Sequence, residues 1–244
     1  MSQTITITSE DIISQIKISF KTSELIEDIL SFKIIQNAAE QAGITVSDQE
    51  LQQAADQMRL SQNLKNADDT WEWLNKNYLS LEDFEKLVYK NTLSGKLAVH
   101  LFADKIEPYF YEHQLDYVSV VCYEILLEDE DLAMELFYAI QEGEMSFFEV
   151  AHKYIENKDL RRKLGYKGKL YRKDLKPEIS AAVFAAKPPQ LLKPILTSKG
   201  AHLILVEEII QPELNNLLRH KIATELFNDW VKQQIEQLDF TTAL

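Results

Sequence analysis

The sequence is poor in cysteine, glycine and proline, and each shortage narrows the range of folds. Its 244 residues include one cysteine, Cys122, which excludes an intramolecular disulfide and a metal site built from several cysteines. Only 6 glycines and 6 prolines are present, too few for a β-sandwich with many tight turns, so the composition favours helices. No run approaches 18 apolar residues, and we therefore expect no membrane span.

Positive charge is also scarce. The chain has 26 Lys and Arg against 39 Asp and Glu, a net charge of −13. Such an acidic chain is a poor general binder of nucleic acid or of an anionic membrane surface. The first residues, MSQTITITSEDIISQIK, lack a basic segment followed by an apolar one, so no export signal is readable and we expect a cytoplasmic protein.

Residues 22–103 follow a helical pattern. Apolar residues recur at helical spacing in the first part of this segment, at Leu25, Ile29, Phe32, Ile35 and Ala39. Gly43 is a helix-stop signal, and Ser47 and Ser80 are each followed three residues later by an acidic residue, which is typical of a capped helix start. The segment therefore predicts four helices joined by short loops. A last long helix is expected from Pro212 to about Leu238.

Residues 116–210 show a different pattern. Residues 117–127, YVSVVCYEILL, are typical of a buried strand, and two helices are expected to follow it, the second after Ser146. After a basic loop, the chain predicts a short helix near 177–185 and strands near 194–197 and 201–209. This order is that of an α+β unit. We thus predict a helical domain formed by residues 1–115 plus 211–244, with an α+β domain, residues 116–210, inserted in it.

Short motifs in this inserted segment occur in a fixed order. They are Glu124-Ile125-Leu126-Leu127, Gly143-x3-Phe147-x3-Ala151, Leu164-Gly165, Phe184 and the closing run PILTSKGAHLI from Pro194 to Ile204. In order and spacing, residues 118–209 resemble the parvulin-type peptidyl-prolyl cis-trans isomerases. Residues 25–102 and the last helix resemble the helical parts of SurA- and PrsA-like foldases. The resemblance implies a parvulin-like (FKBP-like) α/β domain and a helical chaperone region that holds unfolded polypeptide.

The implied chemistry needs no cofactor. Rotation about an X–Pro bond has a barrier of about 18–20 kcal/mol because amide resonance must be broken, but no bond is made. A site must only hold the proline ring in apolar surroundings and favour the twisted amide. The resemblance assigns the apolar pocket to Leu164, Leu175 and Ile179, with Phe184 in support. It assigns the polar residues to His202, Glu124, Asn157 and Thr197.

Several of these positions depart from the family pattern. Glu124 stands where parvulins usually have a first histidine, Asn157 where they have Cys or Asp, and Arg161-Arg162 where they have two glycines. We therefore expect a foldase that binds extended, proline-containing polypeptide and isomerises it weakly. The alternatives are a catalytically silent peptide-binding chaperone that uses the same groove, and an adaptor whose isomerase fold is vestigial. The oligomeric state is not predicted.

Two residues of the first and last strands are interpreted together. A buried carboxylate costs several kcal/mol unless it is paired, so Glu124 on an otherwise apolar strand needs a partner, which we predict to be His202. His202 alone is typical of a satisfied core histidine, but the run Thr197 to His202 favours a role in organising the site. Cys122, on the same strand face as Glu124, is interpreted as a small buried hydrophobe.

One basic run contrasts with the acidic chain. Nine Lys or Arg lie between Lys158 and Lys176 against two aspartates, Asp159 and Asp174. A solvated face is the ordinary interpretation. Our hypothesis is that Arg161, Arg162 and their neighbours steer acidic proline-containing polypeptides to the site. Nucleic-acid binding is not favoured because few aromatic residues are interleaved with the cations.

The helical region also has aromatic residues at helical spacing. Trp71, Trp73, Phe84 and Tyr89 are interpreted as core rather than as a client-binding cradle. Trp230 is expected to anchor the last helix against the other helices.

Overall fold

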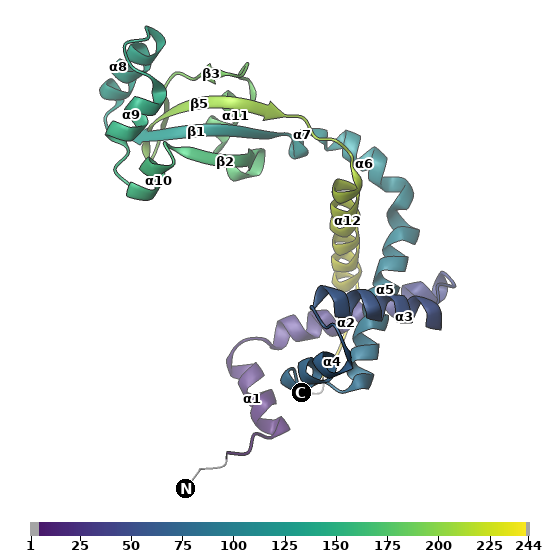
Figure 1. The fold of residues 1–244 in the computed structure, drawn as a ribbon. Coiled ribbons are helices and arrows are strands. Elements are labelled where there is room, and N and C mark those ends of the chain that lie inside the picture. Colours follow the sequence, from purple (N-terminus) through teal and green to yellow (C-terminus); the bar gives the residue numbers. More distant parts are fainter. Residues whose placement is uncertain (1–4, 243–244) are drawn as a thin grey trace. The chain divides into compact units, whose positions relative to one another are not determined.

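The computed structural model describes residues 5–242, which form two compact units (Figure 1). The first unit is helical and takes the chain up to residue 107 and again from residue 216, whereas the second comprises residues 108–215. The second unit is longer at both ends than the predicted range of 116–210. At its start it includes most of α6 (Ile106–Glu112) and the short helix α7 (Gln114–Tyr117). The predicted fold class, a helical region from both parts of the chain with an inserted α+β domain, is confirmed. Within residues 5–242, no helix is both long and apolar enough to span a bilayer.

The four helices predicted between residues 22 and 103 are present. The first unit consists of α1 (Ser9–Ile18), α2 (Thr22–Gln41), α3 (Asp48–Ser61), α4 (Ala67–Lys76), α5 (Leu81–Phe102), the 3-10 turn η1 (Ala103–Lys105) and α12 (Asn216–Glu236). Helix α1 was not predicted, although Thr8 and Asp11 form a capping box at its start. Capping boxes also begin α3, with Ser47 and Glu50, and α5, with Ser80 and Asp83, as predicted. These local signals define the helix starts because each satisfies backbone N–H groups of the first turn.

Helices α2, α5 and α12 share one apolar core. Ile35, Leu97 and Phe227 are buried in it, and Trp230 packs on Phe227 with ring centroids 5.7 Å apart. The predicted anchoring role of Trp230 is thus confirmed. A second cluster contains Phe84, with Trp73 packed edge-on at 6.2 Å.

Two predictions for this unit were wrong. Trp71 retains 51% of its surface, so it is not a core residue, although Trp73, two positions away, is packed. The last helix begins at Asn216, not at Pro212, and residues 211–215 are not helical. Asn215, of a type preferred at the N-cap, directly precedes the first turn, whereas Gln211 before Pro212 is a poor cap.

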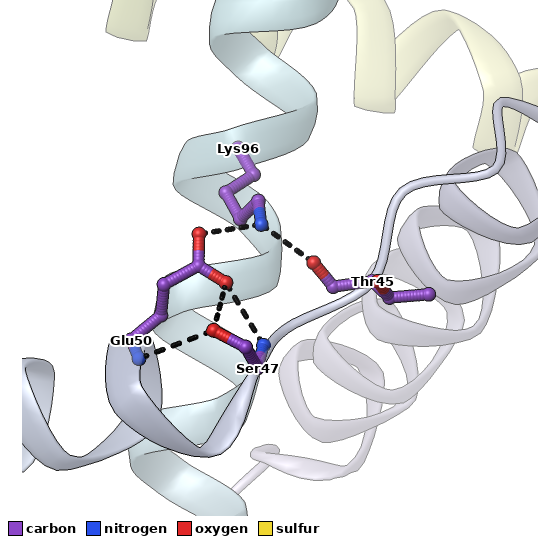
Figure 2. A network of polar contacts seen from close by, with 4 residues as sticks. All are labelled: Thr45, Ser47, Glu50 and Lys96. Carbon is purple, nitrogen blue, oxygen red and sulfur yellow. Dashed lines mark hydrogen bonds and ion pairs between the residues drawn. The ribbon is translucent and has the colours of Figure 1, made fainter.

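A lysine on α5 joins the start of α3 to the loop before it (Figure 2). Nζ of Lys96 lies 2.6 Å from Oε1 of Glu50 and 2.6 Å from the carbonyl oxygen of Thr45. The other carboxylate oxygen, Oε2, accepts hydrogen bonds at 2.8 Å from the backbone N–H and from the hydroxyl of Ser47. The hydrogen bond from Lys96, followed by those from Ser47, lowers the pKa of Glu50 from 4.5 to about 2.

This network predicts an acid-sensitive helical unit. A carboxyl group whose pKa is lower in the folded than in the unfolded chain stabilises the fold fully above pH 4.5, and this contribution is lost as the pH falls towards 2. We expect Glu50→Gln to be less stable than the wild type at neutral pH and to lose less stability between pH 4.5 and 2. Lys96→Met should act in the same direction, since it removes the strongest cause of the shift. Thermal unfolding followed by circular dichroism over this pH range measures the effect, and parallel curves for Glu50→Gln and the wild type would contradict it.

The second unit is a small antiparallel sheet with helices on both faces (Figure 1). Along the chain it contains β1 (Ser119–Leu127), α8 (Glu130–Gln141), α9 (Phe147–Tyr154), α10 (Lys158–Arg162), β2 (Tyr166–Tyr171), the 3-10 turn η2 (Arg172–Asp174), α11 (Pro177–Phe184), β3 (Gln190–Leu191), β4 (Ile195–Thr197) and β5 (Gly200–Ile210). The order across the sheet is β2-β1-β5-β3, and β4 also pairs with β5. The two central strands, β1 and β5, come from opposite ends of the unit.

Each face of this sheet has its own apolar core. On the α8–α9 face, Ile125 and Leu203 pack with Leu136 and Val150. On the α11 face, Cys122 and Ile204 pack with residues of α11. Side chains on a strand alternate between the two faces, so consecutive residues of β1 belong to different cores.

Strand β2 lies where a basic loop was predicted. It pairs with β1 and forms an edge of the sheet. The two lysines of this strand, Lys167 and Lys169, give it the composition of a charged loop, but lysines are typical of edge strands because they discourage pairing with other chains. The charge that suggested a loop therefore belongs to an exposed strand.

Candidate functional site

The predicted pairing of Glu124 with His202 is confirmed. Glu124 lies opposite Ile204 in the β1–β5 ladder, so His202 is its diagonal neighbour on the α11 face. Nδ1 of His202 lies 2.6 Å from Oε1 of Glu124, and His202 is only 5% exposed. A carboxylate on an apolar strand thus has the hydrogen-bonding partner that its burial requires.

Thr197 of β4 holds the other side of the imidazole ring. Its Oγ1 lies 2.8 Å from Nε2 of His202 and accepts a hydrogen bond at 3.1 Å from the backbone N–H of Lys199. The hydroxyl of Thr197 also has one proton to donate, and Nε2 is an acceptor within its reach when that ring nitrogen carries no proton. In the neutral ring, this arrangement favours the tautomer in which Nδ1–H donates to Glu124. The two partners thus fix the orientation of the ring and select its neutral tautomer.

Lys167 of β2 completes the polar site, and sequence reasoning missed it. Its Nζ lies 2.8 Å from Oε2 of Glu124, the oxygen that His202 does not use. Burial raises the pKa of Glu124, but the hydrogen bonds from Lys167 and His202 and the charge of Lys167 outweigh burial, so the pKa is lowered overall. Glu124 therefore stays ionised at neutral pH. The signal that could have identified Lys167 is the alternation of two lysines with other residues in the run YKGKLY, which is typical of a strand.

Cys122 precedes Glu124 on the same face, but it is not a nucleophile at neutral pH. Burial and the negative charge of Glu124 raise the pKa of its thiol to about 11, although the positive charge of Lys167 acts in the opposite direction. The thiol stays protonated and packs with Ile204. The interpretation of Cys122 as a small buried hydrophobe is confirmed.

Three of the four apolar residues assigned by resemblance lie on this face. Ile179 is buried there, and Leu175 and Phe184 pack beside it as half-buried residues. The guanidinium of Arg172 lies over the Phe184 ring, 4.2 Å from its centroid, as a cation–π pair. The α11 face therefore combines an apolar group with the hydrogen-bonded polar set of Lys167, Glu124, His202 and Thr197, which we call the polar network.

Leu164 does not join this group. It packs against the core of the opposite, α8–α9 face. Leu164 and Gly165 both have left-handed backbones, with φ of +53° and +81°, so strand alternation does not extend through them. The resemblance assigned Leu164 to the apolar pocket, but in this structure it packs on the opposite face from Leu175 and Ile179.

The remaining three predicted site residues lie on or next to α10. The side-chain oxygen of Asn157 accepts hydrogen bonds from the backbone N–H groups of Asp159 and Leu160, at 3.0 Å each, and so caps this helix. Arg162 lines a cavity on the α8–α9 face together with Leu164, and Arg161 is its half-buried neighbour. Asn157 acts as a cap, and the structure shows no contact between it and the polar network.

Known proteins share this architecture. Residues 128–208 match the family model described as Rotamase, the PPIC-type PPIASE domain; the match includes Thr197 and His202 and begins just after β1, which carries Glu124. The chain is 22% identical over 224 residues to the foldase protein PrsA of Caldanaerobacter subterraneus subsp. tengcongensis, covering 91% of this chain and 69% of that protein. It is 24% identical over 216 residues to PrsA of Halalkalibacterium halodurans, covering 82% and 64%.

A solved structure shows the same fold. The crystal structure of the peptidylprolyl isomerase PrsA from Bacillus anthracis is 18% identical, covers 89% of this chain and 100% of its own, and has a TM-score of 0.51. This chain spans about two thirds of the length of the two PrsA relatives. Residues 128–208 are therefore similar to the parvulin-type peptidyl-prolyl cis-trans isomerases, and the chain as a whole is similar in sequence and in fold to the PrsA foldases.

Proposed function

We propose that the chain is a foldase that binds extended client polypeptide and rotates X–Pro bonds at the α11 face, with lower turnover than a parvulin with unaltered polar residues. The observation that carries this proposal is the polar network, which lies on the same face as the apolar group of Leu175, Ile179 and Phe184. A twisted amide has less charge separation than a planar one, so apolar surroundings favour it. The imidazole of His202, held by Glu124 and Thr197, keeps the polar groups beside this apolar surface in place.

Two features support the lower turnover. Glu124, ionised and paired, stands at the position of the family's first histidine. Asn157, at the position of the family's Cys or Asp, is occupied as a helix cap. Both reduce the number of polar groups that can respond to the substrate carbonyl. A silent chaperone that binds at the same face is the alternative, and the assay below separates the two.

We further propose that cations beside the site favour acidic residues before proline. Nζ of Lys176 lies 3.3 Å from Oγ of Ser198, in the turn that follows Thr197, and Lys199 is exposed in the same turn. We assign the steering role to these lysines instead of to Arg161 and Arg162, because Arg162 lines a cavity on the opposite face of the sheet. The predicted location in the cytoplasm stays a prediction, which cell fractionation would test.

A protease-coupled isomerisation assay on X–Pro tetrapeptides tests these proposals. We expect acceleration, with acidic X about two- to fivefold faster than basic X, because exposed ion pairs contribute up to about 1 kcal/mol. Reversing Lys176 and Lys199 to Glu should abolish this ranking, whereas reversing Lys153 on α9 should not. Binding of the peptides without acceleration would establish the silent chaperone. An unchanged ranking in the Lys176 and Lys199 variant would contradict the steering.

A further inference from the structure

The second unit has a cavity of about 600 Å³ on the α8–α9 face, opposite the polar network. Three aromatic residues line it: Tyr123 of β1, Phe148 of α9 and Tyr166 of β2. The Tyr123 ring centroid lies 5.2 Å from that of Phe148 and 5.2 Å from that of Tyr166. Phe148 and Tyr166 nevertheless retain 41% and 42% of their surface. The cluster is therefore open to solvent on one side.

Strand alternation separates this cavity from the polar network. Tyr123 and Glu124 are consecutive on β1, and Tyr166 and Lys167 are consecutive on β2, so each strand sends one residue to each face. Tyr123 pairs with Tyr166 at a break in the β1–β2 register, of the kind that often re-aims side chains next to sites. Residues of the cavity can thus be changed without removing any member of the polar network.

Charged residues border the aromatic cluster asymmetrically. Arg162 and Lys163 approach from the end of α10, and Glu207 approaches from β5. Arg162 is 3.4 Å from Asp159, but the two side chains are 79% and 85% exposed, so this pair is weak. Within residues 5–242, the Lys163 ammonium has no hydrogen-bonding or ion-pair partner. Two cations on a chain of net charge −13 are thus available on one side of the rings.

We propose that this cavity is a second polypeptide-binding site, which takes an aromatic side chain of an extended client segment with carboxylates next to it. The aromatic ring of the client would pack edge-on against Phe148 and Tyr166, as aromatic pairs prefer. The carboxylates would pair with Arg162 and Lys163, because Glu207 repels them from the other side. That the ligand is a client polypeptide rests on the proposed function, whereas the site itself is independent of the polar network.

A proline-free probe separates this site from isomerisation. The probe is a fluorescein-labelled peptide with one tryptophan followed by two aspartates, and binding to the full chain is measured by fluorescence anisotropy. We expect Phe148→Ser combined with Tyr166→Ser to weaken binding about tenfold or more, because it removes two aromatic contacts. The matched control, Tyr138→Ser, changes a similarly exposed tyrosine on α8 and should leave binding unchanged. Isomerisation of a tetrapeptide should be the same in all three proteins.

Charge reversal provides a second, independent arm. Arg162→Glu combined with Lys163→Glu should weaken the aspartate peptide but not its asparagine counterpart. The inference is overturned if the wild type does not bind the probe, or if the serine and glutamate variants bind it as the wild type does. If the probe binds through these residues while no tetrapeptide is isomerised, the second site stands and the proposed catalysis fails.

Discussion

Gly165→Ala is expected to lower the free energy of unfolding of the second unit by about 2–5 kcal/mol. A left-handed backbone costs an alanine about 1–2 kcal/mol more than a glycine, and Gly165 has φ of +81°. In addition, a Cβ at this position would lie 2.5 Å from the backbone carbonyl oxygen of Glu124. Relieving such an overlap requires a backbone shift, which typically costs about 1–3 kcal/mol. Urea unfolding of the two proteins measures the difference.

Gly143 offers a matched control in the same unit. Its φ is +79°, but a Cβ there meets no atom within 4 Å, so Gly143→Ala should cost only the left-handed backbone penalty of about 1–2 kcal/mol. Equal losses for the two variants would show that the close approach to Glu124 is not significant. Because the N–H of Glu124 donates to the carbonyl of Gly165 at 2.9 Å, the Gly165 variant should also displace Glu124 from His202.

Glu124→Leu is expected to reduce kcat/KM for X–Pro isomerisation by roughly 10- to 100-fold. The substitution removes the acceptor of the His202 Nδ1–H and leaves Lys167 without its ion-pair partner. Hydrogen bonds to charged groups are worth about 1.5–3 kcal/mol, which corresponds to this range if the ordered imidazole acts in the transition state. Glu124→Gln retains an acceptor for Nδ1–H but loses the charge that faces Lys167, so its activity should be intermediate.

A spectroscopic readout separates a positioning role from a merely structural one. Nitrogen NMR at a pH at which the imidazole is neutral should show the proton of His202 on Nδ1 in the wild type, and Glu124→Leu should shift the ring towards a mixture of tautomers. Lys167→Met should lower activity as well, whereas Lys169→Met, two residues along the same strand, should not. A Glu124→Leu variant that is folded and retains full activity would show that the polar network does not contribute to isomerisation.

The parts of the fold that could be predicted are those with local or obligatory causes. The starts of α3, α5 and α9 were predictable because Ser47, Ser80 and Ser146 with their acidic partners satisfy the first backbone N–H groups of a helix. The pairing of Glu124 with His202 was predictable because a carboxylate on a buried strand needs a partner.

The parts that could not be predicted depend on context that the local pattern does not contain. Lys167 looks like a loop residue in isolation, since only the neighbouring strand β1 makes its segment an edge strand. Leu164 has a positive φ that is unusual for leucine, and no periodicity predicts the direction of such a side chain. The aromatic cavity combines residues of β1, α9, α10, β2 and β5, so it exists only in the folded chain.

The helical unit is formed by two segments that are far apart in the sequence, so it can be completed only late in synthesis. Its core joins Ile35 and Leu97 to Phe227 and Val231 of α12, which are made only after the whole of the second unit. The second unit is contiguous, so all of its residues are available to fold while the apolar surfaces of α2 and α5 still lack α12. On the ribosome, the second unit can therefore fold before the helical unit, whose residues lie on both sides of it in the sequence.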